Sequence, residues 1–333
     1  MADRRTLAAF AATAVFFGGT FVAAKAGLAY FPPLLFVALR FDVAAVALAA
    51  YAVATTARED LLPKTRGDAV GIFATGVLAI GLTNALLFVG QQYATSAVAS
   101  IVFSLNPILT PVFAAALLAD ERLSARGAAG MVLGLLGVGL VVNPDPAMLA
   151  DGGVGQLILF AGAVTGALGS VLIRWADSTI SSTVRTAWGL PFAAALSHAL
   201  SLGAGESAAS IVWTPEAVLA LAYVGIFAGA IAYIAYFGLL DRTGAIRANL
   251  VFYAVPVVST LGGWALLDER ISGLAIVGFL TIFAGFAVLG TEDVDVRGQV
   301  ARLAGRLPDE IVDAEDAEER LGIRNEPRGF ESD

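Results

Sequence analysis

The sequence predicts an all-α polytopic membrane protein, in which ten transmembrane helices form two inverted five-helix repeats. First, 58% of the 333 residues are hydrophobic and only 14% are charged, whereas soluble domains carry about 25% charged residues. Second, apolar stretches of roughly 20 residues, the length that crosses a bilayer, recur from end to end. Third, the charged phrase LLADERLS at 117–124 returns as LLDERIS at 266–272.

The apolar stretches are continuous and do not alternate with polar residues, which favours helices over strands. Turn-forming residues separate several of them, such as Pro32 and Pro33 after the first stretch and Asn143-Pro144 after the fifth. Because most connections are short, we expect consecutive helices to be antiparallel neighbours. The predicted helices span residues 6–29, 33–56, 69–92, 95–119, 124–142, 154–175, 184–203, 216–240, 245–267 and 273–290.

The basic residues predict the orientation, because cytoplasmic ends of transmembrane helices are enriched in Lys and Arg. With the N-terminus inside, Arg270 is the one basic residue in an outer connection, and Lys25 and Arg40 lie within helices. All other basic residues then fall at cytoplasmic ends or in the tail. We therefore expect a multi-pass protein of the cell membrane with both termini in the cytoplasm.

The two charged phrases belong to a longer internal repeat. Each repeat holds five helices, at residues 1–143 and 154–290. Because five is odd, the second repeat enters the membrane inverted, an arrangement typical of secondary transporters. One residue of slippage upstream aligns Pro107 with Pro256. At an offset of 148, the matching residues are Leu118, Asp120, Glu121, Arg122, Ser124, Gly130 and Gly137 with Leu266, Asp268, Glu269, Arg270, Ser272, Gly278 and Gly285.

Residues 6–290 resemble the EamA branch of the drug/metabolite transporter superfamily. The resemblance rests on Phe17-Gly18-Gly19-Thr20, on Pro33 followed by Arg40, and on two matching segments, SAVASIVFSLNPILTPVFAAALLADERLS and GAIRANLVFYAVPVVSTLGGWALLDERIS. It implies a substrate cavity enclosed mainly by the first, third, fourth, sixth, eighth and ninth helices. It also implies transport of small metabolites, amino acids or drugs, often outward. Many relatives carry Glu before the proline of the ninth helix; Val255 stands here, so an acidic coupling group is absent at that position.

Polar and aromatic residues within the predicted helices are candidates for the substrate cavity. Amides at this depth either hydrogen-bond neighbouring helices or offer donors and acceptors to a polar substrate, and both interpretations stay open. Aromatic rings would form a cavity wall, with helix packing or an interfacial belt as the alternative. The candidates are Asn84, Phe88, Asn106, Trp188, Tyr253 and Trp264.

Three charged residues within the helices are candidates for ion coupling or ion pairing, because charge is costly in hydrocarbon. Lys25 and Arg40 lie toward the outer ends of their helices, so the alternative is that both reach the interface or pair with carboxylates. Asp42 is the best acidic candidate for proton coupling. The prolines Pro107, Pro111 and Pro256 are candidates for hinges, since a proline inside a helix kinks it and frees a carbonyl; a static kink is the alternative.

These features predict a secondary transporter that works by alternating access and exports small amphipathic or zwitterionic solutes, such as amino acids, or drugs. A mostly neutral cavity wall argues against a highly charged substrate. A non-transporting membrane scaffold or sensor is the alternative. Enzymatic activity is not expected, because the chain has no cysteine and one histidine, His198. We expect no cofactor, no metal and no nucleic-acid partner, only the solute and membrane lipid. No nucleotide-binding P-loop occurs, so ATP would not drive transport directly.

Residues 291–333 form an acidic cytoplasmic tail with 13 acidic and six basic side chains, which predicts a solvated segment. Excess acidic residues and scarce lysines resemble proteins of salt-accumulating organisms and indicate a haloarchaeal source. We interpret both charged phrases as surface connections, and Ser124 is expected to cap the fifth helix.

Overall fold

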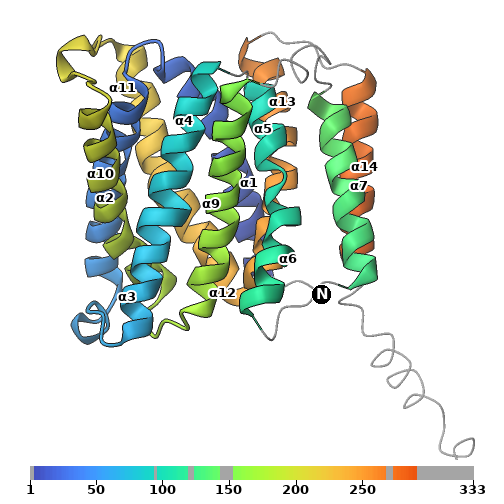
Figure 1. Cartoon of the computed structure of the whole chain (residues 1–333), viewed down its shortest axis with the longest axis horizontal. Helices are drawn as coiled ribbons and strands as arrows, with labels where there is room; N and C mark the ends of the chain where they lie inside the picture. The colour runs from blue at the N-terminus through green and yellow to red at the C-terminus, as the bar shows by residue number, and fades with distance from the viewer. Residues whose placement is uncertain (1–3, 94–95, 119–123, 143–152, 268–272, 291–333) are drawn as a thin grey trace, which may run out of the picture. The chain divides into compact units, whose positions relative to one another are not determined.

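The computed structural model describes residues 4–93, 96–118, 124–142, 153–267 and 273–290. Within these ranges all regular elements are helical (Figure 1). The charged residues of the repeated phrases and the acidic tail lie outside the described residues.

The first repeat contains five helical segments, two of which are interrupted. The third segment contains a π-helical stretch, and the fourth is broken at Ser104–Leu105. The first two segments are α1 (Arg4–Gly27) and α2 (Pro33–Thr55). The third is one continuous helix made of α3 (Arg66–Phe73), η2 (Ala74–Leu82) and α4 (Thr83–Tyr93). The fourth consists of α5 (Ser96–Phe103) and α6 (Asn106–Leu117), and the fifth is α7 (Ala125–Val142).

The second repeat has the same plan. Its third segment also contains a π-helical stretch, and the backbone leaves the helical conformation at Gly244 with φ 83°, so the ninth predicted helix begins just after this kink. Glycine suits this position because it has no Cβ to oppose a positive φ. The elements are α9 (Val154–Trp175), α10 (Ser182–Gly203), α11 (Pro215–Ala222), η4 (Tyr223–Ile231), α12 (Ala232–Asn249), α13 (Val251–Leu267) and α14 (Gly273–Gly290).

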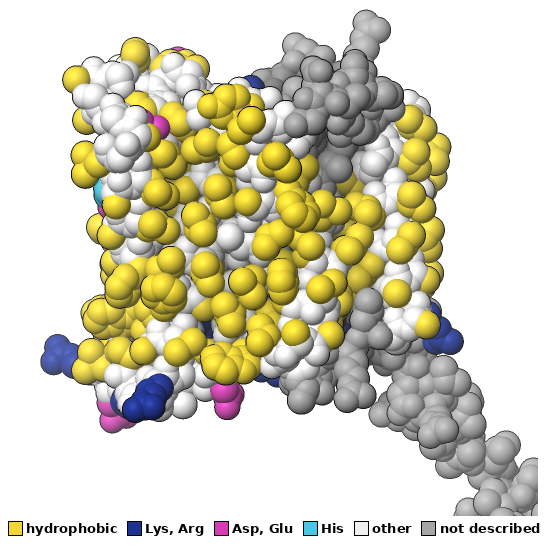
Figure 2. Space-filling model, viewed as in Figure 1, with side chains coloured by type: hydrophobic (Ala, Val, Ile, Leu, Met, Phe, Trp, Pro, Cys, Tyr) yellow, Lys and Arg dark blue, Asp and Glu magenta, His cyan; other side chains and the backbone are white. Residues whose placement is uncertain are grey.

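The prediction of an all-α fold with ten helices in two repeats is confirmed. Five of the described helices are long and apolar enough to cross a membrane, and four shorter helices are apolar. On the face shown in Figure 2, hydrophobic side chains cover the middle of the described bundle, and most Lys and Arg side chains lie toward one end. An apolar belt between polar ends matches a bilayer.

Side-chain caps fix several helix starts. The backbone N–H of Gly127 donates to Ser124 Oγ at 2.9 Å, which confirms the predicted cap of the fifth helix. Thr65 and Asp68 form a reciprocal capping box at the start of α3. Such a box satisfies backbone N–H groups that have no partner within the helix.

The two π-helical stretches occupy matching positions in the two repeats. Both are nine residues long, and Tyr223 starts the second one 149 positions after Ala74 starts the first. Gly76 in η2 packs against the backbone of Gly189 in α10, and Gly225 in η4 packs against Val43 and the backbone of Arg40 in α2. The same separation of 149 relates Gly76 to Gly225 and Arg40 to Gly189, so the contacts are equivalent.

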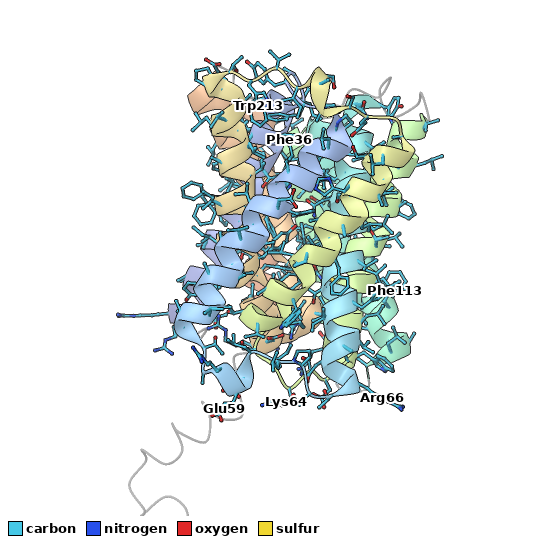
Figure 3. All side chains as sticks on the ribbon, turned by 90° about the vertical axis from the view of Figure 1, so that its left-hand side faces the viewer. Phe36, Glu59, Lys64, Arg66, Phe113 and Trp213 are labelled. Atoms are coloured by element: carbon cyan, nitrogen blue, oxygen red, sulfur yellow. The ribbon has the colours of Figure 1, made fainter. Side chains whose placement is uncertain are left out.

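One carboxylate at each end of the bundle binds a segment of the other repeat. In the connection after α10, Glu206 accepts from the backbone N–H groups of Leu34 and Leu35, at 3.1 and 2.7 Å, and so caps α2. In the first turn of α3, Asp68 accepts from the backbone N–H groups of Thr179 and Ile180, at 2.7 and 3.2 Å, in the connection to α10. Figures 1 and 3 show these two connections at opposite ends.

Candidate functional site

A buried cavity lies where the two repeats meet, among α1, α2, η2, α4, α5, α6, α9, α12 and α13. Its volume is about 60 Å³, enough for a few water molecules, whereas small-molecule sites usually enclose roughly 300–1,000 Å³. These elements include all six helices that the resemblance implied, and α2 in addition. Its wall is mostly aromatic and aliphatic, with Arg40, Thr20, Thr83, Asn84, Asn106, Tyr233 and Tyr236 as its polar side chains.

Asn84 joins α2 to α12 at the centre of this cavity. Its Oδ1 accepts from Arg40 Nη1 at 3.2 Å. Its Nδ2 donates to Tyr233 Oη at 2.8 Å and to the carbonyl of Ile80 at 2.7 Å. Asn84 and Tyr233 are 149 positions apart, so equivalent positions of the two repeats meet here.

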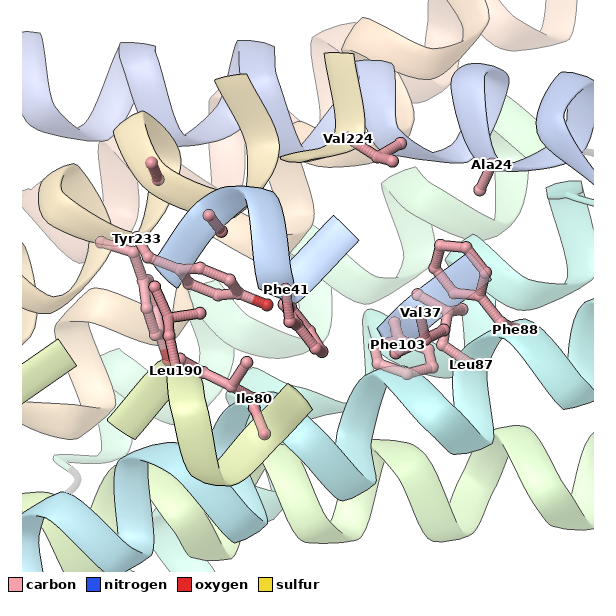
Figure 4. Close-up of a cluster of buried hydrophobic side chains, with 14 of the residues drawn as sticks. Ala24, Val37, Phe41, Ile80, Leu87, Phe88, Phe103, Leu190, Val224 and Tyr233 are labelled. Atoms are coloured by element: carbon pink, nitrogen blue, oxygen red, sulfur yellow. The ribbon is translucent and has the colours of Figure 1, made fainter. Parts of the chain in front are cut away.

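The Arg40 side chain is only 1% exposed and lies between aromatic rings. Its guanidinium carbon is 4.9 Å from the centroid of the Phe41 ring and 5.4 Å from that of Phe88. Figure 4 shows Phe41 and Tyr233 on one side of the surrounding apolar cluster, and Phe88 and Leu87 on the other. Among the described residues, Arg40 has no carboxylate partner, and its Nε has no hydrogen-bond acceptor.

Asn106 is the first residue of α6, next to Pro107 and just after the interruption at Ser104–Leu105. Its Nδ2 donates to the carbonyl of Phe103 at 2.9 Å, which is the carbonyl that the missing N–H of Pro107 leaves free. Its Oδ1 is buried without a partner in the described part of the chain. This oxygen points toward Gly166, another residue of the cavity wall.

Pro256 has an equivalent effect on α13. It leaves the carbonyl of Phe252 without its helical donor, and Ser104 Oγ donates to that carbonyl at 3.2 Å. Pro111 lies inside α6, one turn beyond Pro107. Both freed carbonyls are therefore bonded by polar side chains of the fourth segment, and both belong to cavity-wall residues.

A second polar cluster, centred on Asn249, lies beside the cavity. Asn249 Oδ1 accepts from Tyr236 Oη at 2.8 Å. Its Nδ2 donates to Thr110 Oγ1 at 3.0 Å and to Ser170 Oγ at 2.7 Å. Because this amide is fully bonded and 0% exposed, it links α6, α9 and α12.

Three of the other predicted cavity residues, Phe88, Trp188 and Tyr253, do not line the cavity. Phe88 is buried beside Arg40. Trp188 is 41% exposed, and its Nε1 donates to the carbonyl of Leu61 at 2.8 Å. Tyr253 packs on Gly134 and donates to the carbonyl of Met131. The side chain of Trp264 lies outside the described residues.

Lys25 and Asp42 do not line the cavity. Lys25 is exposed in the last turn of α1. Asp42 Oδ2 lies 2.9 Å from His198 Nε2, and both side chains are about half exposed. The structure thus places one of the three charged candidates, Arg40, in the cavity.

Because Asp42 is half exposed and outside the cavity, we expect Asp42→Asn to change the free energy of unfolding by less than about 0.5 kcal/mol. Solute uptake should stay within about twofold of the wild type at both acidic and alkaline pH. Thermal unfolding in detergent and uptake by proteoliposomes check this. A variant that unfolds normally but loses a pH dependence seen in the wild type would identify Asp42 as the coupling group.

Sequence inspection missed several cavity residues: Phe17, Thr20, Thr83, Tyr233, Tyr236 and Phe252. A signal for two of them was present. Tyr233 stands 149 positions after Asn84, and Phe252 stands at the same separation from Phe103. The repeat offset, applied to Asn84 and Phe103, would have found these partners.

Comparisons with known proteins agree with this arrangement. The model of the EamA-like transporter family matches twice, over residues 4–143 and 153–291. An "Uncharacterized transporter" of Archaeoglobus fulgidus is 26% identical over 280 residues, covering 84% of this chain and 96% of that protein. "Uncharacterized transporter YyaM" of Bacillus subtilis is 29% identical over 285 residues, covering 83% and 88%.

A solved structure described as "Crystal structure of protein" aligns with a TM-score of 0.68 and 27% identity, covering 85% of this chain and 96% of that one. The two family matches coincide with the two five-helix repeats on either side of the cavity. The chain belongs to the EamA-like transporter family, as a multi-pass membrane protein.

Proposed function

We propose that the protein is a secondary transporter that exports small metabolites across the cell membrane by alternating access. The observation that carries this proposal is the buried cavity at the junction of the two repeats. Its few polar side chains come from both repeats, as Asn84 and Tyr233 do. A binding site at the repeat interface is the arrangement through which such transporters alternate between the two sides.

The pairs of equivalent contacts support an inverted relation between the repeats. The Glu206 and Asp68 contacts lie at opposite ends of the bundle, and each joins one repeat to the backbone at or just before the start of the second helix of the other repeat. The glycine contacts are also paired: η2 of the first repeat contacts α10 of the second, and η4 of the second repeat contacts α2 of the first. A two-fold axis in the membrane plane relates contacts of this kind, so both faces have equivalent means of opening.

The size of the cavity supports a conformational cycle. At about 60 Å³ it is too small for an amino acid, so binding requires some of the surrounding helices to move apart. Pro107, Pro111 and Pro256 lie in the two segments that would bend. The carbonyls freed by Pro107 and Pro256 accept hydrogen bonds from side chains, which can break and re-form as the segments bend. We propose these prolines as hinges.

We propose that both termini face the cytoplasm. Figure 3 shows Glu59, Lys64 and Arg66 at one end of the bundle, with Trp213 and Phe36 at the other. The end with the basic residues is the one expected inside.

Transport by purified protein in proteoliposomes tests the proposal. Vesicles loaded with a broad panel of metabolites should release at least one solute faster than protein-free vesicles, and release should depend on a solute or ion gradient and not on ATP. Repeating the panel with and without a pH gradient separates proton coupling from uniport. If no solute in the panel crosses faster than in empty vesicles, the scaffold or sensor interpretation replaces transport.

A further inference from the structure

Asp42 in α2 and His198 in α10 form a polar pair on the lipid-facing surface of the bundle. Oδ2 of Asp42 lies 2.9 Å from Nε2 of His198, and the two side chains are 47% and 41% exposed. Neither residue lines the cavity. Asp42 follows Pro33, the first residue of α2, by nine positions, which places it roughly 13 Å from that end of the helix. The exposed side of the pair therefore faces hydrocarbon and not lipid headgroups.

The contact within the chain leaves one polar atom of each residue without a partner. An imidazolium donates from both ring nitrogens, and a carboxylate accepts at both oxygens. The 2.9 Å contact uses Nε2 and Oδ2, and within the described part of the chain Nδ1 of His198 and Oδ1 of Asp42 have no hydrogen-bond partner. Lipid tails offer neither donors nor acceptors, so polar groups at this depth are costly unless other protein groups meet them.

The helix faces on either side of the pair are apolar and exposed. Figure 1 shows α2 and α10 at the left edge of the bundle, where they pack together, and Figure 3 looks onto this edge. The exposed residues recur at spacings of three and four, as on a helix face that packs against another helix. Several are alanine, and small residues let helices approach closely. They are Val46, Ala49 and Val53 in α2, and Phe192, Ala195, Ala199 and Leu202 in α10.

We infer that the α2–α10 face binds a second copy of the chain, in a two-fold dimer whose axis runs along the membrane normal. Copies of one chain insert into the membrane in the same orientation, so a second copy presents its own Asp42 and His198 at the same depth. Across the axis, Nδ1–H of each protonated His198 donates to Oδ1 of the partner's Asp42. Four charges of alternating sign then form a closed ring, and the two atoms left unpaired within one chain are satisfied.

Charge complementarity favours a second copy over a lipid or an unrelated protein. The Asp42–His198 pair carries one anion and one cation, so a partner must present the two opposite charges at the same spacing. The same pair turned by a two-fold axis does this, because such an interface is self-complementary. Each chain encloses its own cavity, so the dimer is not needed to complete a transport site, and this inference does not depend on the proposed function.

Cysteine crosslinking in liposomes locates the interface without changing the pair. The chain has no cysteine, so a single introduced one reports on one position. Val46→Cys and Ala199→Cys flank the pair, and at least one of them should join two copies through a short bismaleimide. Leu280→Cys in α14, where Leu280 is 66% exposed, is the matched control and should stay monomeric. Crosslinking at Leu280→Cys alone, at neither face or equally at both would overturn the interface.

Complementation between two variants tests the ring of charges. Asp42→Leu and His198→Leu each lose both bonds between chains when paired with themselves. A mixed dimer keeps one bond, from His198 of one chain to the partner's Asp42. One hydrogen bond between helices changes association by roughly 3- to 30-fold. Energy transfer between copies labelled at Leu280→Cys should therefore show each variant alone associating at least about ninefold more weakly than wild type. The mixture should associate at least about threefold more strongly than either variant alone.

The mixture separates a contact between chains from one within a chain or with lipid. If it associates no better than the single variants, the ring is wrong, even where the protein dimerises through another face. A wild-type protein that stays monomeric at every protein-to-lipid ratio would overturn the dimer itself. The crosslinking experiment keeps Asp42 and His198, so it still decides the matter if either leucine variant fails to fold. Failure of every solute in the transport panel would leave this inference standing.

Discussion

Asp68→Ala is expected to lower the free energy of unfolding by about 3 kcal/mol, because it leaves several donors without an acceptor at once. The carboxylate is 0% exposed and accepts from both the backbone N–H and Oγ1 of Thr179, and from Ser178 Oγ at 2.9 Å. It also accepts from the backbone N–H groups of Lys64 and Thr65, each at 2.9 Å. The side chain thus joins the start of α3 to the connection between α9 and α10.

The apparent melting temperature in detergent measures this loss. Asp60→Ala is the matched control, because Asp60 lies in the connection just before α3, is largely exposed, and makes a weak ion pair with Lys64 at 3.8 Å. It should change stability by less than about 0.5 kcal/mol. Glu206→Ala should fall between the two, since Glu206 accepts three hydrogen bonds. Equal melting temperatures for Asp68→Ala and Asp60→Ala would show that the Asp68 contacts add nothing to stability.

The helices were predictable because membrane-spanning segments depend on length and hydropathy, which are local properties. The interruptions were less visible. Pro107 pointed to a kink in the fourth segment, and the structure interrupts the helix just before it, at Ser104–Leu105. The eighth segment was predicted to end at 240, yet it continues to the kink at Gly244. The first position follows from the missing N–H of Pro107 and the second from a positive φ that glycine permits, and hydropathy reports neither.

The cavity was only partly predictable, because depth in the membrane can be read from the chain but rotation about a helix axis cannot. Asn84 and Asn106 line the cavity, whereas Trp188 and Tyr253, which the sequence also places within helices, do not. In a helix that is apolar all round, no polar stripe marks the inner face. The contact between Asn84 and Tyr233 arises from the pairing of the repeats, which is a long-range property.

Several glycines lie close against neighbouring helices, and the strongest effect of a single added methyl group is expected at Gly76. A Cβ at this position would press on the backbone of Gly189, its carbonyl oxygen included. Backbone atoms cannot rotate aside as a side chain can, so α10 must move away from η2. Because overpacking of this kind costs about 1–3 kcal/mol, we expect Gly76→Ala to lower stability by about 3 kcal/mol.

Two further Gly→Ala substitutions make the result interpretable. At Gly225, the equivalent position of the second repeat, the nearest atoms are those of the Val43 side chain, so adjustment is easier and the loss should be smaller. At Gly139 in α7 nothing lies within 4 Å of the added Cβ, and alanine should stabilise the helix by up to about 1 kcal/mol. The melting temperature should therefore be highest for Gly139→Ala, followed in order by the wild type, Gly225→Ala and Gly76→Ala. A Gly76→Ala variant as stable as Gly139→Ala would mean that η2 and α10 are not in contact here, and the cavity beside them would then have a different wall.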